Sequence, residues 1–196
     1  KEAAEASRRT PGAARSAGEA PPLPSDRCLD TPKRVRSFGD LVHFVLEQRI
    51  RGSYSRNIIQ TGLLSRFSAA SRYTLISYAE ALAEVFLGSD LGGLLREAAR
   101  IEPEFDFLVS RDTSEGQVLI NGRADLFFET GQTAYVVDYK TDRLMRPEEH
   151  ANQLELYAHA LKEFTGREVR CFLFYLRFAE AVEIALTGRF LLPETG

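Results

Sequence analysis

The sequence has few cysteines and no long apolar stretch. Cys28 and Cys171 are the only two cysteines in 196 residues, which is too few for a disulfide framework or a four-cysteine metal site. No apolar run reaches the length of a membrane span, and no charged-then-apolar signal segment opens the chain. These absences predict a soluble domain of the reducing cytoplasm, without a membrane partner.

The chain also lacks a phosphate-binding loop and an overall basic charge. No Gly-x4-Gly-Lys-Ser/Thr loop occurs, so we expect no ATP site in this chain. Residues 1–36 carry eight Lys/Arg and five Asp/Glu, whereas residues 37–196 carry the other 17 basic and 23 acidic residues. A domain that binds nucleic acid is usually basic, so the acidic second part argues mildly against DNA as a partner. The objection is weaker if several carboxylates hold a cation.

Composition divides the chain near residue 36. Residues 1–36 contain five of the eight prolines and no aromatic residue, which predicts a linker or a poorly ordered extension. Residues 37–196 suit one globular domain, since a chain of this length with 44% hydrophobic residues can bury a substantial core.

Hydrophobic periodicity predicts the order of helices and strands in this domain. Apolar residues at three- and four-residue steps predict helices over 38–49, 72–87, 91–100 and 146–164. Stretches rich in β-branched and aromatic residues predict strands over 104–109, 118–128, 133–142, 169–176 and 182–186. The first three strands should be antiparallel. We therefore expect an α/β fold, with a central mixed sheet flanked by helices and a helical N-terminal portion.

Charged side chains follow an apolar strand in a pattern that suggests chemistry. Asp138 and Lys140 end the run 134–137, and Asp125 lies thirteen positions before Asp138. Side chains two apart in a strand share a face, so Asp138 and Lys140 should point the same way. Two carboxylates and a lysine can hold a divalent cation beside a phosphodiester and activate water. A surface strand end with a weak salt bridge explains the spacing equally well.

Three motifs in order resemble a known nuclease family. They are Gly-Arg-Ala-Asp at 122–125, Val-Val-Asp-Tyr-Lys-Thr-Asp at 136–142 and Gln-Leu-Glu-Leu-Tyr at 153–157. Together they resemble the nuclease module of RecB and AddA, which forms the C-terminal part of UvrD-like helicase–nucleases. That module belongs to the PD-(D/E)XK superfamily, so the resemblance implies a restriction-endonuclease-like fold.

The resemblance assigns roles to residues that match its motifs. It makes Asp125 and Asp138 metal ligands and Lys140 the catalytic lysine, and it adds the backbone carbonyl of Tyr139 as a further ligand. His43 lies in a segment that resembles the family's first helix, whose histidine also binds the metal. Without the resemblance, a solvated or packing histidine is the better interpretation of His43.

The resemblance also concerns a helix beside the metal site. It implies that Gln153 and Tyr157 help position DNA or the lysine, whereas periodicity alone places Tyr157 in the core. A conserved acidic position of the family falls near Glu102 and Glu104, and the sequence does not decide between them. The implied cofactor is Mg²⁺, or Mn²⁺ in its place. No iron–sulfur cluster is implied, because the four cysteines of iron–sulfur relatives are missing.

These features predict a metal-dependent DNA exonuclease domain that hydrolyses phosphodiester bonds. The resemblance implies that this domain is part of an ATP-dependent helicase–nuclease of double-strand-break repair. The helicase would lie upstream in the same chain, and a second subunit would be its partner. It would act on single-stranded DNA ends in a bacterial-type cytoplasm, associated with the nucleoid. Two alternatives are a non-catalytic DNA-binding or scaffold domain that retains the fold, and a stand-alone exonuclease.

Overall fold

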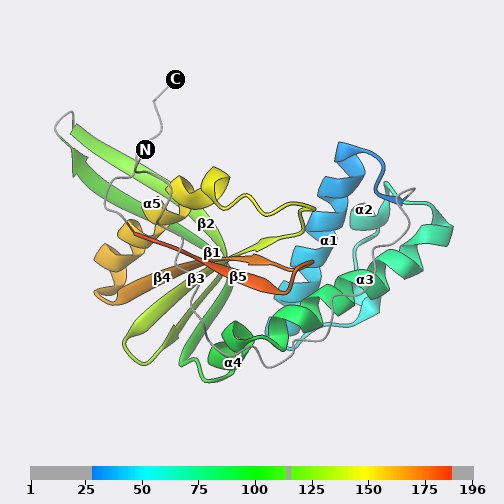
Figure 1. Ribbon diagram of the computed structural model, residues 1–196, viewed down its shortest axis with the longest axis horizontal. Helices are drawn as coiled ribbons and strands as arrows, with labels where there is room; N and C mark the ends of the chain where they lie inside the picture. Colours follow the sequence, from blue (N-terminus) through cyan, green and yellow to red (C-terminus); the bar gives the residue numbers. More distant parts are fainter. Residues whose placement is uncertain (1–27, 114–115, 187–196) are drawn as a thin grey trace, which may run out of the picture.

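The computed structural model describes residues 28–113 and 116–186 and contains one five-stranded sheet (Figure 1). In chain order the elements are α1 (Pro32–Ile50), the short 3-10 helix η2 (Arg56–Ile58), α2 (Thr61–Leu64), α3 (Ala69–Leu87), α4 (Asp90–Arg96), β1 (Arg100–Thr113), β2 (Gly116–Thr130), β3 (Thr133–Lys140), α5 (Glu148–Thr165), β4 (Glu168–Tyr175) and β5 (Glu180–Ile184). The strand order is β1-β2-β3-β4-β5, with β3 and β4 parallel and the other neighbours antiparallel. The predicted mixed sheet with flanking helices is confirmed.

Helices cover the two faces of the sheet and create two cores. Helices α1, α3 and α4 pack on one face, and α5 packs on the other (Figure 1). The first core includes Phe38, Leu75, Phe86, Phe128 and Val137, and the second includes Phe127, Val136, Leu154 and Leu161. Each of these buried side chains contributes about 1.5–3 kcal/mol relative to exposure. The alternation of β3 residues between the cores therefore fixes which way each side chain of that strand points.

Helix α1 begins inside the segment that composition assigned to the extension. Thr31 is its N-cap and accepts a hydrogen bond from the backbone N–H of Arg34 at 3.3 Å, while Pro32 occupies the first helical position. Proline is favoured there because its fixed φ suits the helix and its missing N–H needs no partner. Helix α1 thus starts five residues before residue 37, where the nuclease domain is predicted to begin. Residues 1–27 of that predicted extension lie outside the described residues.

The other wrong boundaries reflect long-range pairing. Helix α4 ends at Arg96 rather than at residue 100, because the backbone N–H of Ala99 donates to Glu129 O at 2.8 Å and Arg100 pairs with Glu129 in the sheet. β1 consequently starts earlier than the predicted strand. β3 ends at residue 140 rather than 142, and the last strand starts and ends two residues earlier than predicted.

The segment between α1 and α3 holds two short helices that the sequence did not predict. η2 and α2 have three and four residues, which is too short to show a helical period. Within the described residues, no helix combines the length and apolarity needed to cross a membrane.

Candidate metal centre

The site forms where β2 and β3 separate. Their pairing runs from Thr130 opposite Thr133 to Leu126 opposite Val137 and then stops. Beyond that point the backbone N–H of Tyr139 donates to Asp125 Oδ2 at 2.7 Å. An aspartate side chain thus satisfies a strand N–H that has lost its neighbouring strand. This bond holds Asp125 beside the end of β3.

β1 is irregular opposite Asp125. Its register places Glu104 across from Asp125, between the pairs Pro103–Leu126 and Phe105–Ala124, but the pairing is interrupted at this position. Glu104 has a φ of 53°, a left-handed conformation that costs a non-glycine residue about 1–3 kcal/mol. This backbone conformation directs the carboxylate of Glu104 toward the site. Of the two acids that the sequence left undecided, Glu104 is therefore the one at the site.

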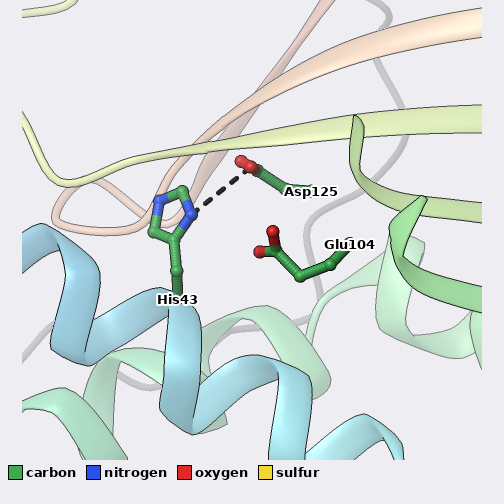
Figure 2. Close-up of side chains that lie close together, drawn as sticks. All are labelled: His43, Glu104 and Asp125. Carbon is green, nitrogen blue, oxygen red and sulfur yellow. Dashed lines mark ion pairs between the residues drawn. The ribbon is translucent and has the colours of Figure 1, made fainter. Parts of the chain in front are cut away.

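Helix α1 supplies the histidine. Its C-terminal end is tied to β1, because Arg51 Nη2 donates to the carbonyl of Pro103 at 3.1 Å. His43 Nδ1 lies 3.3 Å from Asp125 Oδ1, and its Nε2 lies 3.2 Å from the carbonyl oxygen of Tyr139. Figure 2 shows His43, Glu104 and Asp125 directed toward one another from α1, β1 and β2. The predicted ligands His43, Asp125 and Tyr139 are thus brought together.

The three side chains form a compact ligand group. One ligand atom each of His43, Glu104 and Asp125 lies within 4.8 Å of the others. Burial lowers the pKa of His43, but the hydrogen bond to Asp125 and the charges of Asp125, Asp138 and Glu104 raise it, to about 9 from 6.5. Burial and the charge of Asp125 raise the pKa of Glu104. The acidic groups around His43 therefore favour the protonated form of its imidazole.

Asp138 and Lys140 lie on neighbouring positions of the same strand face, as predicted. Lys140 Nζ lies 2.7 Å from Asp138 Oδ2. Burial, and next the charge of Asp125, raise the pKa of Asp138, whereas Lys140 lowers it. Within the described residues, Asp138 is not part of the compact ligand group. It is nevertheless close enough to influence His43 electrostatically.

Gln153 and Tyr157 contact each other on α5. Gln153 Nε2 donates to the hydroxyl of Tyr157 at 2.7 Å, and the Tyr157 ring packs edge-on against Phe107 at 4.9 Å. A Cβ atom at Gly122 would lie 2.3 Å from Phe107 and 2.8 Å from Tyr157, so this close packing requires glycine there. Neither Gln153 nor Tyr157 lines the pocket at His43. Their role in positioning DNA or Lys140 remains a prediction.

The donor set suits a hard divalent cation. The ligand group lines a pocket of about 460 Å³. Two carboxylates and a backbone carbonyl are the oxygen ligands that Mg²⁺ and Mn²⁺ favour, and a neutral imidazole adds one nitrogen. The residues that surround the pocket therefore fit such an ion.

Sequence comparison identifies the family to which this arrangement belongs. A profile of the PD-(D/E)XK nuclease superfamily matches residues 15–188. The chain belongs to this superfamily. Its α/β sheet with flanking helices agrees with the restriction-endonuclease-like fold that the motifs at 122–125 and 136–142 predicted.

Several proteins similar to this PD-(D/E)XK chain carry the same protein name. The A subunit of the ATP-dependent helicase/nuclease of Lactiplantibacillus plantarum is 30% identical over 159 residues, covering 70% of this chain and 12% of the relative. The protein of that name from Carboxydothermus hydrogenoformans is 30% identical over 119 residues, 53% of this chain and 10% of the relative. The chain spans about a tenth of the length of these relatives. They support the predicted RecB/AddA type of nuclease domain.

Proposed function

We propose that this chain is a metal-dependent deoxyribonuclease that hydrolyses phosphodiester bonds. The observation that carries the proposal is the convergence of His43, Glu104 and Asp125 at one pocket, with the Tyr139 carbonyl in contact with His43. The Asp138–Lys140 pair stands on the adjoining strand end. Membership of a nuclease superfamily supports the same reaction.

The proposed ligands are His43, Asp125, Asp138 and the carbonyl of Tyr139, with Glu104 as a further acidic group. A bound Mg²⁺ or Mn²⁺ ion would supply Lewis-acid chemistry at the scissile phosphate. The protein fixes the ligands in advance, because the Tyr139 N–H holds Asp125 and the imidazole of His43 contacts both Asp125 and Tyr139. This preorganisation reduces the rearrangement needed during the reaction.

Lys140 is proposed as the catalytic lysine. Its ammonium group is held by the Asp138 carboxylate at 2.7 Å, so it lies next to a proposed ligand. From there it can orient the attacking water, help remove its proton and offset charge on the phosphate. Gln153 and Tyr157 belong to the helix on the same side of the sheet and are proposed to position Lys140 or the DNA.

We further propose an exonuclease that acts on single-stranded DNA ends within a larger helicase–nuclease. The name of the relatives, an ATP-dependent helicase/nuclease, supports a helicase in the same protein and an ATP dependence that belongs to the whole protein. We place that helicase upstream of this chain. A role in double-strand-break repair, a nucleoid-associated location in the cytoplasm and a second subunit are proposed with it. The division between an extension at 1–36 and a nuclease domain at 37–196 is part of the same proposal, with helix α1 beginning before that boundary at Pro32.

The proposal is tested by cleavage of end-labelled single-stranded DNA in Mg²⁺ or Mn²⁺. Wild-type protein should release labelled products, and EDTA should stop the release. Asp138→Asn and Lys140→Ala should each slow cleavage by roughly a hundredfold or more. Lys162→Ala, which removes an exposed lysine of α5, is the matched control and should cleave like wild type. Equal, EDTA-insensitive behaviour of all variants would instead support a non-catalytic scaffold.

A further inference from the structure

Most arginines in residues 28–113 and 116–186 are engaged by acceptors. In the described ranges they hold carboxylates or backbone carbonyls, as in the pairs Arg34–Asp30, Arg56–Glu80, Arg123–Asp106, Arg170–Glu183 and Arg177–Thr141. Two arginines in the described part of the chain, Arg36 and Arg66, have neither an ion pair nor a side-chain hydrogen bond. An exposed arginine without an acceptor is free to bind an anion from solution.

Arg36 lies in the pocket of the metal centre. It is the only arginine or lysine among the described residues that line this pocket, whereas Asp40, Glu47 and Asp142 add acidic groups to the ligand carboxylates. On α1, Arg36, Asp40, His43 and Glu47 follow one another at three- and four-residue steps and so share one face. The described lining is therefore mostly acidic along this face, and Arg36 is its one cation, at the N-terminal end of α1. Glu47 at the other end is paired with Arg51 at 2.9 Å.

The spacing separates Arg36 from the metal ligands. Arg36 precedes His43 by seven residues, which is roughly 10 Å along a helix. Gly39 lines the pocket between them without a side chain, and a Cβ there would lie 3.5 Å from Thr141 Oγ1. Between the two positions the pocket therefore presents helix backbone, the hydroxyl of Thr141 and the carboxylate of Asp40. Arg36 is too far away to share a single phosphate with the metal centre, but it can reach a neighbouring one.

We propose that Arg36 binds a backbone phosphate of the DNA strand next to the phosphate at the metal centre. This inference rests on the proposed nuclease function and adds a phosphate contact to it. A strand with one phosphate at the metal centre and a neighbouring one at Arg36 runs along α1 between them, past Gly39 and Asp40, which also line the pocket. A planar guanidinium suits such a phosphate, since it donates two parallel hydrogen bonds.

The test compares Arg36→Ala with Arg66→Ala, the other unengaged arginine, which does not line the pocket. Binding of a fluorescent single-stranded oligonucleotide is followed by anisotropy over a range of salt concentrations, in the Lys140→Ala background so that the DNA stays intact. Arg36→Ala should weaken binding roughly three- to tenfold and make the slope of log K against log salt shallower by about 0.7. Arg66→Ala should leave both unchanged, and Arg36→Lys should retain the slope.

Cleavage kinetics separate this inference from the proposed function. With Lys140 intact, Arg36→Ala should raise KM by the same factor and change kcat less than twofold, as expected for a contact made equally in ground and transition states. If wild type cleaves DNA and Arg36→Ala matches it in KM and salt slope, the Arg36 proposal is wrong and the nuclease proposal stands. A wild-type chain that neither cleaves nor binds the oligonucleotide overturns both.

Discussion

Two positions on the β1–β2 strand pair differ in the charges that face each other across the strands: one has opposite charges and the other has like charges. Asp106 stands across from Arg123 and receives two hydrogen bonds from its guanidinium, at 2.6 and 2.9 Å. Two residues along the same strands, the position opposite Glu104 in the register is that of Asp125, another carboxylate, and the pairing is interrupted there. The remaining contact of Glu104 with Arg123 is 3.7 Å long. Accordingly the arginine lowers the pKa of Asp106, whereas burial and Asp125 raise the pKa of Glu104.

The difference distinguishes an acid that is neutralised by a partner within the chain from acids that face a pocket next to another carboxylate. Opposite charges across a strand pair stabilise it, and like charges destabilise it. Asp106 has its partner within the chain. Glu104 and Asp125 share one histidine and face a pocket. The chain therefore tolerates a local cost that a bound cation would remove, and this arrangement can be tested with matched variants.

The largest expected effect comes from Asp125. Asp125→Asn removes a proposed ligand charge but keeps an oxygen that can accept the Tyr139 N–H. We expect DNA cleavage to fall roughly a thousandfold, because several kcal/mol of transition-state stabilisation depend on the held cation. Initial rates on single-stranded DNA at several Mn²⁺ concentrations provide the measurement.

Asp106→Asn is the matched control, since it changes an aspartate on the opposing strand that is 65% exposed and bound to Arg123. Its cleavage rate should stay within about twofold of wild type, as expected for a surface ion pair. If both variants lost activity equally, the contrast between paired and ligand carboxylates would be wrong.

A smaller effect with an unusual sign is expected at Glu104. Glu104→Gln removes a charge that is repelled by Asp125, so the metal-free protein should gain about 0.5–1 kcal/mol of stability. Its Tm in EDTA should rise by about 2–4 °C per kcal/mol, while the further rise on adding Mn²⁺ should shrink. Glu102→Gln, two residues earlier and paired with Arg100 at 3.4 Å, should raise neither value. A lower metal-free Tm for Glu104→Gln would contradict this account.

Local patterns predicted most elements of the fold but not their ends. The helical period identified α1, α3 and α5, since each buries a stripe of apolar residues. The end of α4 escaped prediction because it depends on a hydrogen bond from Ala99 to Glu129, thirty residues away. The start of α1 was missed because Pro32 was taken for linker composition, although Thr31 before it is a suitable cap.

Strand alternation was enough to predict which site residues share a face of the sheet. The residues whose position depends on tertiary structure could not be predicted. Alternation placed Asp138 and Lys140 on one face, and their 2.7 Å contact agrees. The choice between Glu102 and Glu104 depends on a left-handed φ at Glu104 and on register with β2, neither of which has a local signal. Arg36 was missed because its lack of a partner becomes visible only when all neighbours are in place.

The smallest effect is expected for the stability of a variant at Glu80, an acid that has its hydrogen-bond partners within the chain. Glu80 accepts hydrogen bonds from Arg56 Nε at 2.8 Å and from the Tyr54 hydroxyl at 2.7 Å, and the bond with Arg56 is the main reason that the pKa of Glu80 is lowered from 4.5. A lowered pKa stabilises the fold above the unfolded value and loses this contribution as pH falls through the folded value. Glu80→Gln should therefore cost up to about 1 kcal/mol at pH 7, because the partly exposed pair is screened by solvent. In urea unfolding, this difference should disappear on acidification below pH 4.5, while the exposed Glu163→Gln should match wild type throughout. A difference in stability that persisted in acid would mean that Glu80 acts through packing rather than charge. The stabilising role that we assign to acids with a partner in the chain would then be wrong for Glu80.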